Sequence, residues 1–514
     1  MLHWNINAPA ITRSSVMQAC HSAAATRHII PGLICFGIIL RTAQYIFNRS
    51  LWVDEAMLAL NIIDTPFSEI LKPLKYNQGA PIGFLAIETL IVQLLGATEY
   101  ALRLFPFVCG VISLLLFVKV GKHFVESNSV IVALALFAIS YKLIFYSSEV
   151  KQYSSDVAIA LLLYAAMVSI HTVGLNLARV FALGIIGAVA LWFSHPATFI
   201  LAGIGVSLAV CLIYKKDLSQ VLLLTIAGVL WTGSFAVLYF VSLRNLSENA
   251  ELLNFWRKSF MPLPPRSLAD LKWFDDSFIG IFRDTLGLFP ASIAAVLLLI
   301  GCISMAVEKT EKFLLLASPI VITMMASGLH VYPFSGRLLL FAVPSMYFWI
   351  GDGVVRVGSL VRENQNLVVT AMLSMLLVPQ LLYSSTILVK PYSFEEVRPA
   401  IEYMAKRWQP GDILYVYDGA QPTFRFYSGR YGFRRSEYVF GDGSQSLPAL
   451  QTELLAFSGY ERMWLLFAHI DRKNGIYDDL LFREHLRTSR DMIDSFRSKD
   501  AAVYLYKKRE HHRH

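Results

Sequence analysis

The sequence predicts a mainly α-helical protein that crosses a membrane many times and ends in a small α/β domain. Of its 514 residues, 55% are hydrophobic and only 16% are charged, whereas a soluble protein has about 25% charged residues. Hydrophobic residues gather in long runs up to residue 389, and residues 390–514 mix polar with apolar residues. This composition excludes an ordinary soluble enzyme, a disordered chain and a collagen-like chain.

Twelve apolar runs are candidates for membrane-spanning helices, which need about 20 mainly apolar residues each. The runs lie at about residues 28–47, 79–96, 102–120, 128–146, 157–172, 177–193, 196–214, 219–241, 285–307, 313–329, 336–350 and 366–389. Residues before the first run show no cleavable signal pattern, so that run is expected to be a retained anchor.

The loops between the later runs predict their direction across the membrane. Residues 214–217, 308–312 and 356–362 form short loops rich in Lys and Arg. Such loops stay on the cytoplasmic side of a membrane. The long stretch 242–284, the loop 330–334 and the chain after the last run therefore fall on the outer side.

The count of crossings follows from parity. Arg13 and Arg27 precede the first run and orient it from inside to outside. An even number of crossings must then lie between residues 48 and 147, yet three runs occupy that interval. The run 79–96 carries Glu88 at its centre, and an ionised carboxylate in lipid costs about 2.5–3.5 kcal/mol. We therefore expect that run to lie in the outer interface, which leaves about eleven spans.

The predicted organisation has three parts. Residues 1–27 form a cytoplasmic N-terminal arm, 28–389 a transmembrane domain, and 390–514 an extracytoplasmic α/β domain. Within the transmembrane domain, the outer loops are 48–101, which contains an Asp-Glu pair, and 242–284.

The last domain shows its own pattern of elements. Residues 394–408 have the periodicity of an amphipathic helix, and 412–417, 463–467 and 502–506 are rich in β-formers. A small α/β fold is therefore expected there.

Net charge and cysteines exclude two further classes. The net charge is +8, but the Lys and Arg residues are scattered between apolar runs, so they indicate membrane topology and not nucleic-acid binding. The five cysteines show no metal-ligand spacing, and none lies in the C-terminal domain; no disulfide framework is implied.

Ionisable residues collect at the predicted outer ends of the spans. They come from six parts of the sequence, and the set comprises Asp54, Glu55, Arg103, Glu149, Lys151, Asp156, His195, His330 and Arg337. A transporter usually places such groups within its spans. Their position instead predicts a site at the membrane boundary.

Each cluster also has a simpler structural interpretation. Asp54 and Glu55 could mark a helix start, where acids are favoured, or supply a carboxylate base. Glu99 and Arg103 are four residues apart and could pair on one helix. The acids and Lys151 in the loop 146–156 suit a phosphate with its sugar, or lipid headgroups. Arg337 could snorkel to the interface.

The order of these motifs resembles a known family. Trp52-Val53-Asp54-Glu55-Ala56, Gly79-Ala80-Pro81, Glu99-x-x-x-Arg103-Leu104 and Tyr146-Ser147-x-Glu149-x-Lys151-x-Tyr153 resemble the motifs of GT-C membrane glycosyltransferases. The most similar branch is glycosyltransferase family 39-like, which is related to protein O-mannosyltransferases and aminoarabinose transferases. The resemblance covers residues 28–240 well and the later spans more loosely.

The sequence departs from that family at three points, of which the last two leave the acceptor open more than the reaction. The segment Gly79-Ala80-Pro81-Ile82 lacks a His-Pro-Pro found in many members, and Lys151 stands where Arg is common. The C-terminal domain is not the β-trefoil module of eukaryotic protein O-mannosyltransferases.

The resemblance implies a polyprenyl-phosphate-linked sugar donor at the outer face of a bacterial inner membrane. Transfer to a hydroxyl of a lipid, polysaccharide or protein would invert the anomeric centre. Asp54 is the expected base with Glu55 beside it, and Arg103, Lys151 and Arg337 are the phosphate candidates. The other expected substrate-binding residues are Glu149, Tyr153, His330 and Tyr332.

No cofactor is certain from this resemblance. Glu55 and Glu149 would orient the acceptor or, in some GT-C branches, a divalent cation. The rival functions are a lipid or polysaccharide flippase or transporter, and a non-catalytic membrane scaffold.

The topology is tested by a compartment-dependent reporter fused after residue 390. Because eleven crossings start from the inside, the fusion is expected to report the outer side, and so is one at residue 514. A cytoplasmic signal from either fusion contradicts the eleven-span arrangement.

Overall fold

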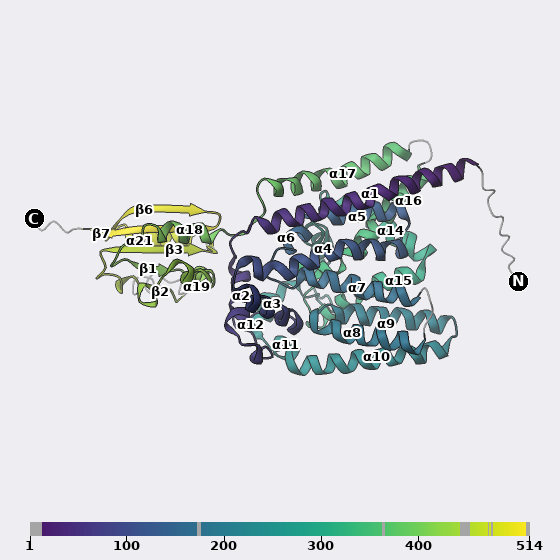
Figure 1. Cartoon of the computed structure of the whole chain (residues 1–514), viewed down its shortest axis with the longest axis horizontal. Coiled ribbons are helices and arrows are strands. Elements are labelled where there is room, and N and C mark those ends of the chain that lie inside the picture. The colour runs from purple at the N-terminus through teal and green to yellow at the C-terminus, as the bar shows by residue number, and fades with distance from the viewer. Residues whose placement is uncertain are drawn as a thin grey trace, which may run out of the picture.

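The computed structural model describes residues 13–171, 176–361, 365–442, 453–470, 472–473 and 476–509. Residues 1–12 of the predicted N-terminal arm and 510–514 of the tail lie outside the described residues. A bundle of long helices forms the body, and a small domain with a β-sheet is attached at one end (Figure 1). The first helix begins at the opposite end of the bundle.

The helical body is made of long helices joined by short ones on the side of the C-terminal domain. The long ones are α1 (Arg13–Ile46), α4 (Glu99–Phe124), α5 (Ser127–Ile139), α7 (Tyr153–His171), α8 (Leu177–Phe193), α9 (Ala197–Tyr214), α10 (Leu218–Leu238), α14 (Ala291–Glu308), α15 (Thr310–Gly328), α16 (Val343–Leu360) and α17 (Gln365–Ser385). The short ones are α2 (Val53–Asp64), η1 (Phe67–Glu69), α3 (Ile82–Leu95), α6 (Tyr141–Tyr146), η2 (Tyr239–Leu243), α11 (Arg244–Ser247), α12 (Ala250–Phe255), η3 (Arg257–Ser259), α13 (Leu268–Gly280), η4 (Ile281–Leu286), η5 (Gly336–Ala342) and η6 (Thr386–Leu388).

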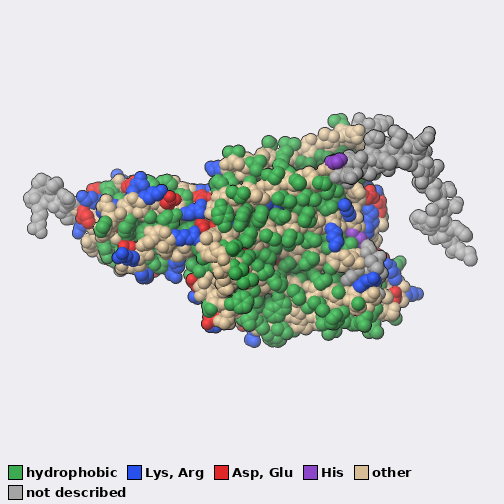
Figure 2. Space-filling view, in the orientation of Figure 1, with side chains coloured by type: hydrophobic (Ala, Val, Ile, Leu, Met, Phe, Trp, Pro, Cys, Tyr) green, Lys and Arg blue, Asp and Glu red, His purple; other side chains and the backbone are tan. Residues whose placement is uncertain are grey.

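Eight helices in the described part of the chain are long and apolar enough to cross a membrane. Three of the shorter apolar helices, α5, α7 and α8, coincide with further predicted spans. Apolar side chains cover most of the visible face of the bundle, and charged side chains gather on the C-terminal domain and at the opposite end (Figure 2). The chain is therefore a multi-pass membrane protein; the count of eleven spans stays a prediction.

Helix α3 is too short to cross a membrane by itself; α5 is as short, but α6 follows it directly in the sequence. The 14 residues of α3 rise about 21 Å at about 1.5 Å each, less than the roughly 30 Å of a hydrocarbon core. It lies with α2 and α12 at the end of the bundle next to the C-terminal domain (Figure 1). This placement agrees with the expected interfacial helix, although its side in the membrane is untested.

The surroundings of Glu88 in α3 differ from those expected from the sequence. Its side chain does not face lipid or the outer surface; it is fully buried where α3 packs against α4. Neither carboxyl oxygen has a hydrogen-bond partner among the described residues. Burial raises the pKa of Glu88 well above its ordinary value, so the carboxyl is held neutral and no ionised group needs solvation.

The C-terminal domain is a five-stranded mixed sheet in the order β2-β1-β3-β7-β6. β1 is parallel to β2 and β3, whereas β7 is antiparallel to β3 and β6. Its elements are α18 (Val397–Ala405), β1 (Ile413–Val416), η7 (Asp418–Ala420), α19 (Gln421–Ser428), η8 (Gly429–Tyr431), η9 (Arg435–Glu437), β2 (Tyr438–Phe440), β3 (Arg462–Ala468), β4 (Arg472–Lys473), β5 (Ile476–Tyr477), α21 (Asp478–Leu486), β6 (Arg490–Ser498) and β7 (Ala501–Lys508). The predicted helix and three strands correspond to α18, β1, β3 and β7.

Two glycines let α14 and α16 approach until their backbones touch. A Cβ atom on Gly353 would lie 2.0 Å from the Leu297 carbonyl oxygen, and one on Gly301 would lie 1.9 Å from the Trp349 carbonyl oxygen. Small residues of this kind are typical of close helix packing in membranes, where van der Waals contact drives association.

Gly353→Ala is therefore expected to lower the melting temperature, because overpacking of a tight contact costs about 1–3 kcal/mol. Gly228→Ala is the control, since a Cβ atom there meets nothing within 4 Å. Ala in an open helix position is favoured by about 0.5–1 kcal/mol. Thermal unfolding in detergent measures both variants; equal melting temperatures would contradict the proposed contact.

Candidate active site

The Asp-Glu pair stands in the first turn of α2. Trp52 has extended backbone geometry and precedes the helix, and Asp54 and Glu55 follow in the first turn. Acidic side chains stabilise a helix N-terminus through the dipole. The position of the pair in α2 is therefore compatible with a helix start and with a carboxylate base. The tertiary surroundings separate the two residues.

Glu55 is fully buried between two arginines. Its Oε2 lies 2.8 Å from the Arg49 Nη1 and 2.8 Å from the Arg103 Nη2. Its Oε1 accepts hydrogen bonds from the Arg103 Nε at 3.0 Å and from the Val150 backbone N–H at 2.9 Å. Both arginine side chains are only 1% exposed. The carboxylate is saturated with donors, which suits a positioning role more than proton transfer.

Asp54 has a more open environment with two cations. Its Oδ1 lies 2.9 Å from the Lys151 Nζ, and its Oδ2 lies 2.8 Å from the Arg337 Nη1. The Gln78 amide donates to Oδ1 at 3.3 Å. Burial alone would raise the pKa of Asp54, but Lys151 and Arg337 outweigh it and hold that pKa well below its ordinary value. The side chain keeps 16% exposure, so a small molecule has access to it.

Aromatic rings surround the Arg337 guanidinium. The Arg337 Cζ atom lies 5.3 Å from the ring centre of Tyr153, 5.9 Å from that of Trp52 and 6.0 Å from that of Trp256. Such stacking on ring faces is favourable for a guanidinium. The rings hold the cation beside Asp54, and the Arg337 side chain keeps 20% exposure.

Glu149 completes the wall of the site. The Trp52 indole donates to its Oε1 at 2.9 Å, and its Oε2 has no hydrogen-bond partner among the described residues. Burial, followed by the charge of Glu55, raises the pKa of Glu149 to about 7. Near neutral pH this carboxyl can therefore hold a proton that Asp54 cannot.

The C-terminal domain holds the segment that precedes α2. Glu396 accepts from the Ser50 hydroxyl at 2.8 Å, and Glu395 accepts from the Val53 backbone N–H at 3.2 Å. The Leu51 backbone N–H donates to the Tyr427 hydroxyl at 2.9 Å. The two domains share one hydrophobic cluster here, so they meet directly at the candidate site.

Glu99 takes part in this domain contact. Its carboxylate pairs with Arg398 at 2.9 Å and Arg430 at 2.5 Å, both from the C-terminal domain, and accepts from the Tyr427 hydroxyl at 3.0 Å. The possible helical pair with Arg103 does not form, because Arg103 turns to Glu55 instead. Glu99 therefore binds two arginines of the C-terminal domain and not the arginine on its own helix.

Two of the predicted residues lie further from Asp54. His330 is exposed, has φ +58° and packs on Phe260. Tyr332 donates to the Leu338 carbonyl at 3.0 Å and packs against Phe199. Neither contacts Asp54 in the described structure, so their part in substrate binding stays a prediction.

The acids of the site do not form a metal centre. Among the described ranges, no three His, Cys, Asp or Glu side chains lie together as a metal-ligand group. Asp54 and Glu55 are instead neutralised by cations of the chain itself. The donor set does not fit the divalent cation considered from sequence, and we derive no step through a metal.

Sequence reasoning missed three members of the site. Arg49 lies six residues before Glu55, and its position directly after the first span was the available signal. Gln78 and Trp256 stand in polar loops without a distinguishing pattern. Only their contacts with Asp54 and Arg337 identify them.

Comparisons with known proteins place this architecture. No family model and no curated protein matches the sequence. Among solved structures, ArnT from Cupriavidus metallidurans in the apo state is 13% identical and superimposes with a TM-score of 0.52. The same protein bound to undecaprenyl phosphate is 12% identical, with a TM-score of 0.53. Each match covers 92% of this chain and 98% of ArnT.

The chain has the ArnT-like GT-C fold. This confirms the fold class expected from the sequence motifs. At 12–13% identity the likeness establishes the fold alone, and function has to be argued from the site.

Within this GT-C fold, Glu55→Gln is expected to destabilise the protein strongly. It leaves the buried Arg49 and Arg103 without a counter-ion, and breaking a buried ion pair costs about 3–5 kcal/mol. Glu69→Gln is the control, because its pair with Lys72 is exposed and such pairs contribute about 0–1 kcal/mol. Thermal unfolding is the measurement; a Glu55→Gln protein as stable as the control would show that the network is not structural.

Proposed function

We propose that this protein is a membrane glycosyltransferase that moves a sugar from a polyprenyl-phosphate donor to a hydroxyl-bearing acceptor. The reaction takes place at the outer face of the bacterial inner membrane, with the C-terminal domain in the periplasm. The observation that carries the proposal is Asp54, an accessible carboxylate held between Lys151 and Arg337 at the end of a GT-C helix bundle. A similar fold in ArnT has been seen with undecaprenyl phosphate.

Arg337 and Lys151 bind the phosphate of the donor. Both are cations at the end of the bundle that carries the outer domain, and Arg337 is held by three rings. As the sugar leaves, negative charge develops on the phosphate, and fixed cations stabilise it. Arg103 is buried on Glu55, so its role is to position the α2 segment and not to contact the donor.

Donor binding also activates the base. In the free protein Lys151 and Arg337 keep the pKa of Asp54 low, which makes its carboxylate a weak base. A phosphate that draws these cations away from Asp54 raises its pKa and therefore its basicity. The base becomes effective only when the donor is in place, which limits unproductive proton transfer.

The transfer itself is a single displacement. The acceptor oxygen forms a bond to the anomeric carbon, and the bond between that carbon and the phosphate oxygen breaks. The phosphate leaves with the bonding electron pair, and Asp54 takes the proton of the acceptor hydroxyl. Attack opposite the leaving group inverts the anomeric centre.

The remaining predicted residues line the donor. Glu149 and Tyr153 lie beside Trp52 and Arg337, where they suit contacts with the sugar. Tyr332 and His330 belong to the loop just before Arg337 and flank that side. The sugar, hexose or pentose, and the chemical identity of the acceptor are set by such contacts.

The decisive experiment is Asp54→Asn. The amide keeps the size of the side chain but cannot take the proton, and loss of a general base slows reactions by about 10²–10⁴-fold. Transfer of labelled sugar from a polyprenyl phosphate by purified protein is measured together with thermal stability. Asp64→Asn is the control, an exposed acid at the other end of α2.

An inactive, well-folded Asp54→Asn protein beside an active Asp64→Asn protein is expected. Full transfer by Asp54→Asn would remove Asp54 as the base and leave Glu55 or Glu149 to be tested in that role. Absence of transfer by the unmodified protein would favour a scaffold or a transporter.

A further inference from the structure

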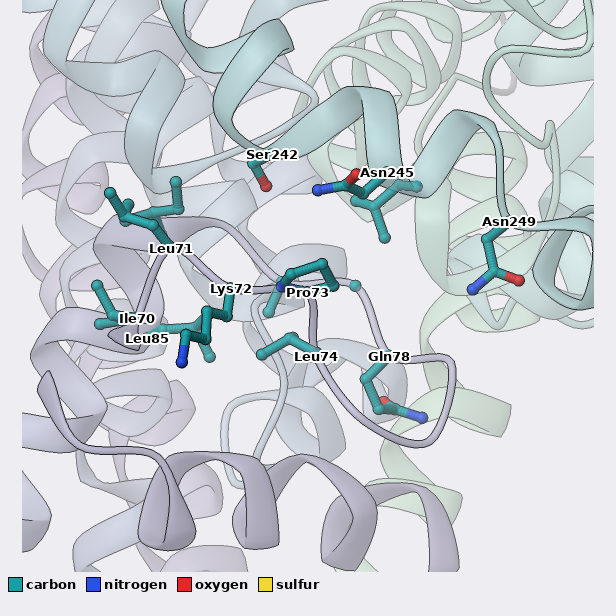
Figure 3. A pocket seen from close by; sticks show the side chains of 14 residues that line it. Ile70, Leu71, Lys72, Pro73, Leu74, Gln78, Leu85, Ser242, Asn245 and Asn249 are labelled. Carbon is teal, nitrogen blue, oxygen red and sulfur yellow. The ribbon is translucent and has the colours of Figure 1, made fainter. Parts of the chain in front are cut away.

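A pocket of about 480 Å³, counting its open mouth, lies beside the proposed site (Figure 3). One wall is the loop between η1 and α3 with the start of α3, and the other is η2, α11 and the turn that follows. The lining residues are Ile70, Leu71, Lys72, Pro73, Leu74, Gln78, Gly79, Ala80, Ile82, Leu85, Ser242, Asn245, Leu246 and Asn249. Chain segments more than 150 residues apart therefore shape one cavity.

The first wall is a fixed loop. Asn61 on α2 makes two hydrogen bonds to the Lys75 backbone, at 2.7 and 3.1 Å. Tyr76 and Asn77 both have positive φ, +61° and +51°, a conformation that is unfavourable for non-glycine residues. Strain of this kind persists only where the surroundings enforce the shape, so the loop geometry is specified.

The two walls are also tied to each other. Asn77 accepts from the Asn249 amide at 3.0 Å and donates to Glu251. At Gly79 the walls come so close that a Cβ atom would lie 3.0 Å from Leu246. These contacts hold the two walls of the pocket together at Asn77 and at Gly79.

The polar part of the lining is neutral. It consists of the Gln78, Asn245 and Asn249 carboxamides with the Ser242 hydroxyl. The one ionisable side chain, Lys72, is mostly exposed and paired with Glu69 at 2.9 Å. Amides and hydroxyls both donate and accept hydrogen bonds, which matches uncharged hydroxyl groups better than a phosphate.

Gln78 joins this pocket to the base. Its amide nitrogen donates to Asp54 Oδ1, and its amide oxygen accepts from Lys151. The other oxygen of Asp54 faces Arg337 and its aromatic rings. Lys151 pairs with the same Oδ1, but of these three partners of Asp54 only Gln78 lines the pocket.

The surroundings of the pocket are apolar. Leu71 is 52% exposed and Phe67 54% exposed on the first wall, and Phe240 in η2 is 70% exposed. Exposed apolar residues beside membrane-spanning helices meet lipid. A molecule that enters here is expected to have a hydrocarbon part and a polar head.

We propose that this pocket binds the acceptor, and that the acceptor is a membrane amphiphile with an uncharged, hydroxyl-bearing carbohydrate head. The inference rests on the proposed function, since it divides the two sides of Asp54 between the substrates. The donor phosphate lies with Arg337 and Lys151, and the acceptor hydroxyl approaches from the pocket, past Gln78. Its proton then passes directly to Asp54.

Photolabelling in lipid vesicles tests this assignment. The probe is an n-decyl β-glucoside with a diazirine in its alkyl chain, and the second probe is a diazirine-bearing undecaprenyl phosphate. The glucoside is expected to label residues 70–85 and 242–249. Asn245→Trp fills the pocket and is expected to reduce that labelling at least tenfold, with labelling by undecaprenyl phosphate unchanged.

Asn254→Trp is the control, because Asn254 is an exposed asparagine nearby on α12 that does not line the pocket. Ser242→Leu is a second, smaller obstruction if Asn245→Trp folds poorly, as judged by thermal unfolding.

Three outcomes overturn the proposal. They are glucoside labelling elsewhere, labelling that neither Asn245→Trp nor Ser242→Leu reduces, and loss of undecaprenyl-phosphate labelling in these variants, which would make this the donor pocket. Labelling needs no turnover, so it tests the pocket alone. Sugar transfer by Asp54→Asn tests the proposed function, and the two results are independent.

Discussion

The buried carboxylate of Glu55 is the interaction on which the site depends. It joins four parts of the chain, because Arg49 follows α1, Glu55 opens α2, Arg103 belongs to α4 and Val150 lies in the loop before α7. A buried charge without partners is very costly, so these segments are held in one arrangement. Asp54 is the residue directly before Glu55 in α2, so the position of its side chain follows from that of Glu55.

The same region explains why a soluble domain is attached to a membrane bundle. Glu395, Glu396 and Tyr427 bind the backbone of residues 50–53, which includes N–H groups that a helix start leaves unpaired. Glu99 receives two arginines from that domain. The C-terminal domain thus supports the loop that carries the acids, and its docking and the geometry of Asp54 are coupled.

Neighbouring acids of the site differ in their electrostatic surroundings. Glu55 is saturated by donors, Asp54 pairs with two cations, and Glu149 is buried with one oxygen that has no hydrogen-bond partner among the described residues. Three carboxyls of one site therefore differ in charge and access because of their surroundings. This difference is what the proposed mechanism uses, since a phosphate can compete for Lys151 and Arg337 but has no access to Arg49.

The sequence by itself determined the class of fold, the helical runs and the strands of the last domain, and it predicted Asp54 as the candidate base. These follow from hydropathy, period and local motifs, which are properties of neighbouring residues. Tertiary structure alone decided the partners: Arg103 with Glu55 and not with Glu99, Glu88 buried and neutral, and Gln78 on Asp54. A buried polar group binds whichever donor the fold brings to it, and that donor comes from a distant part of the chain.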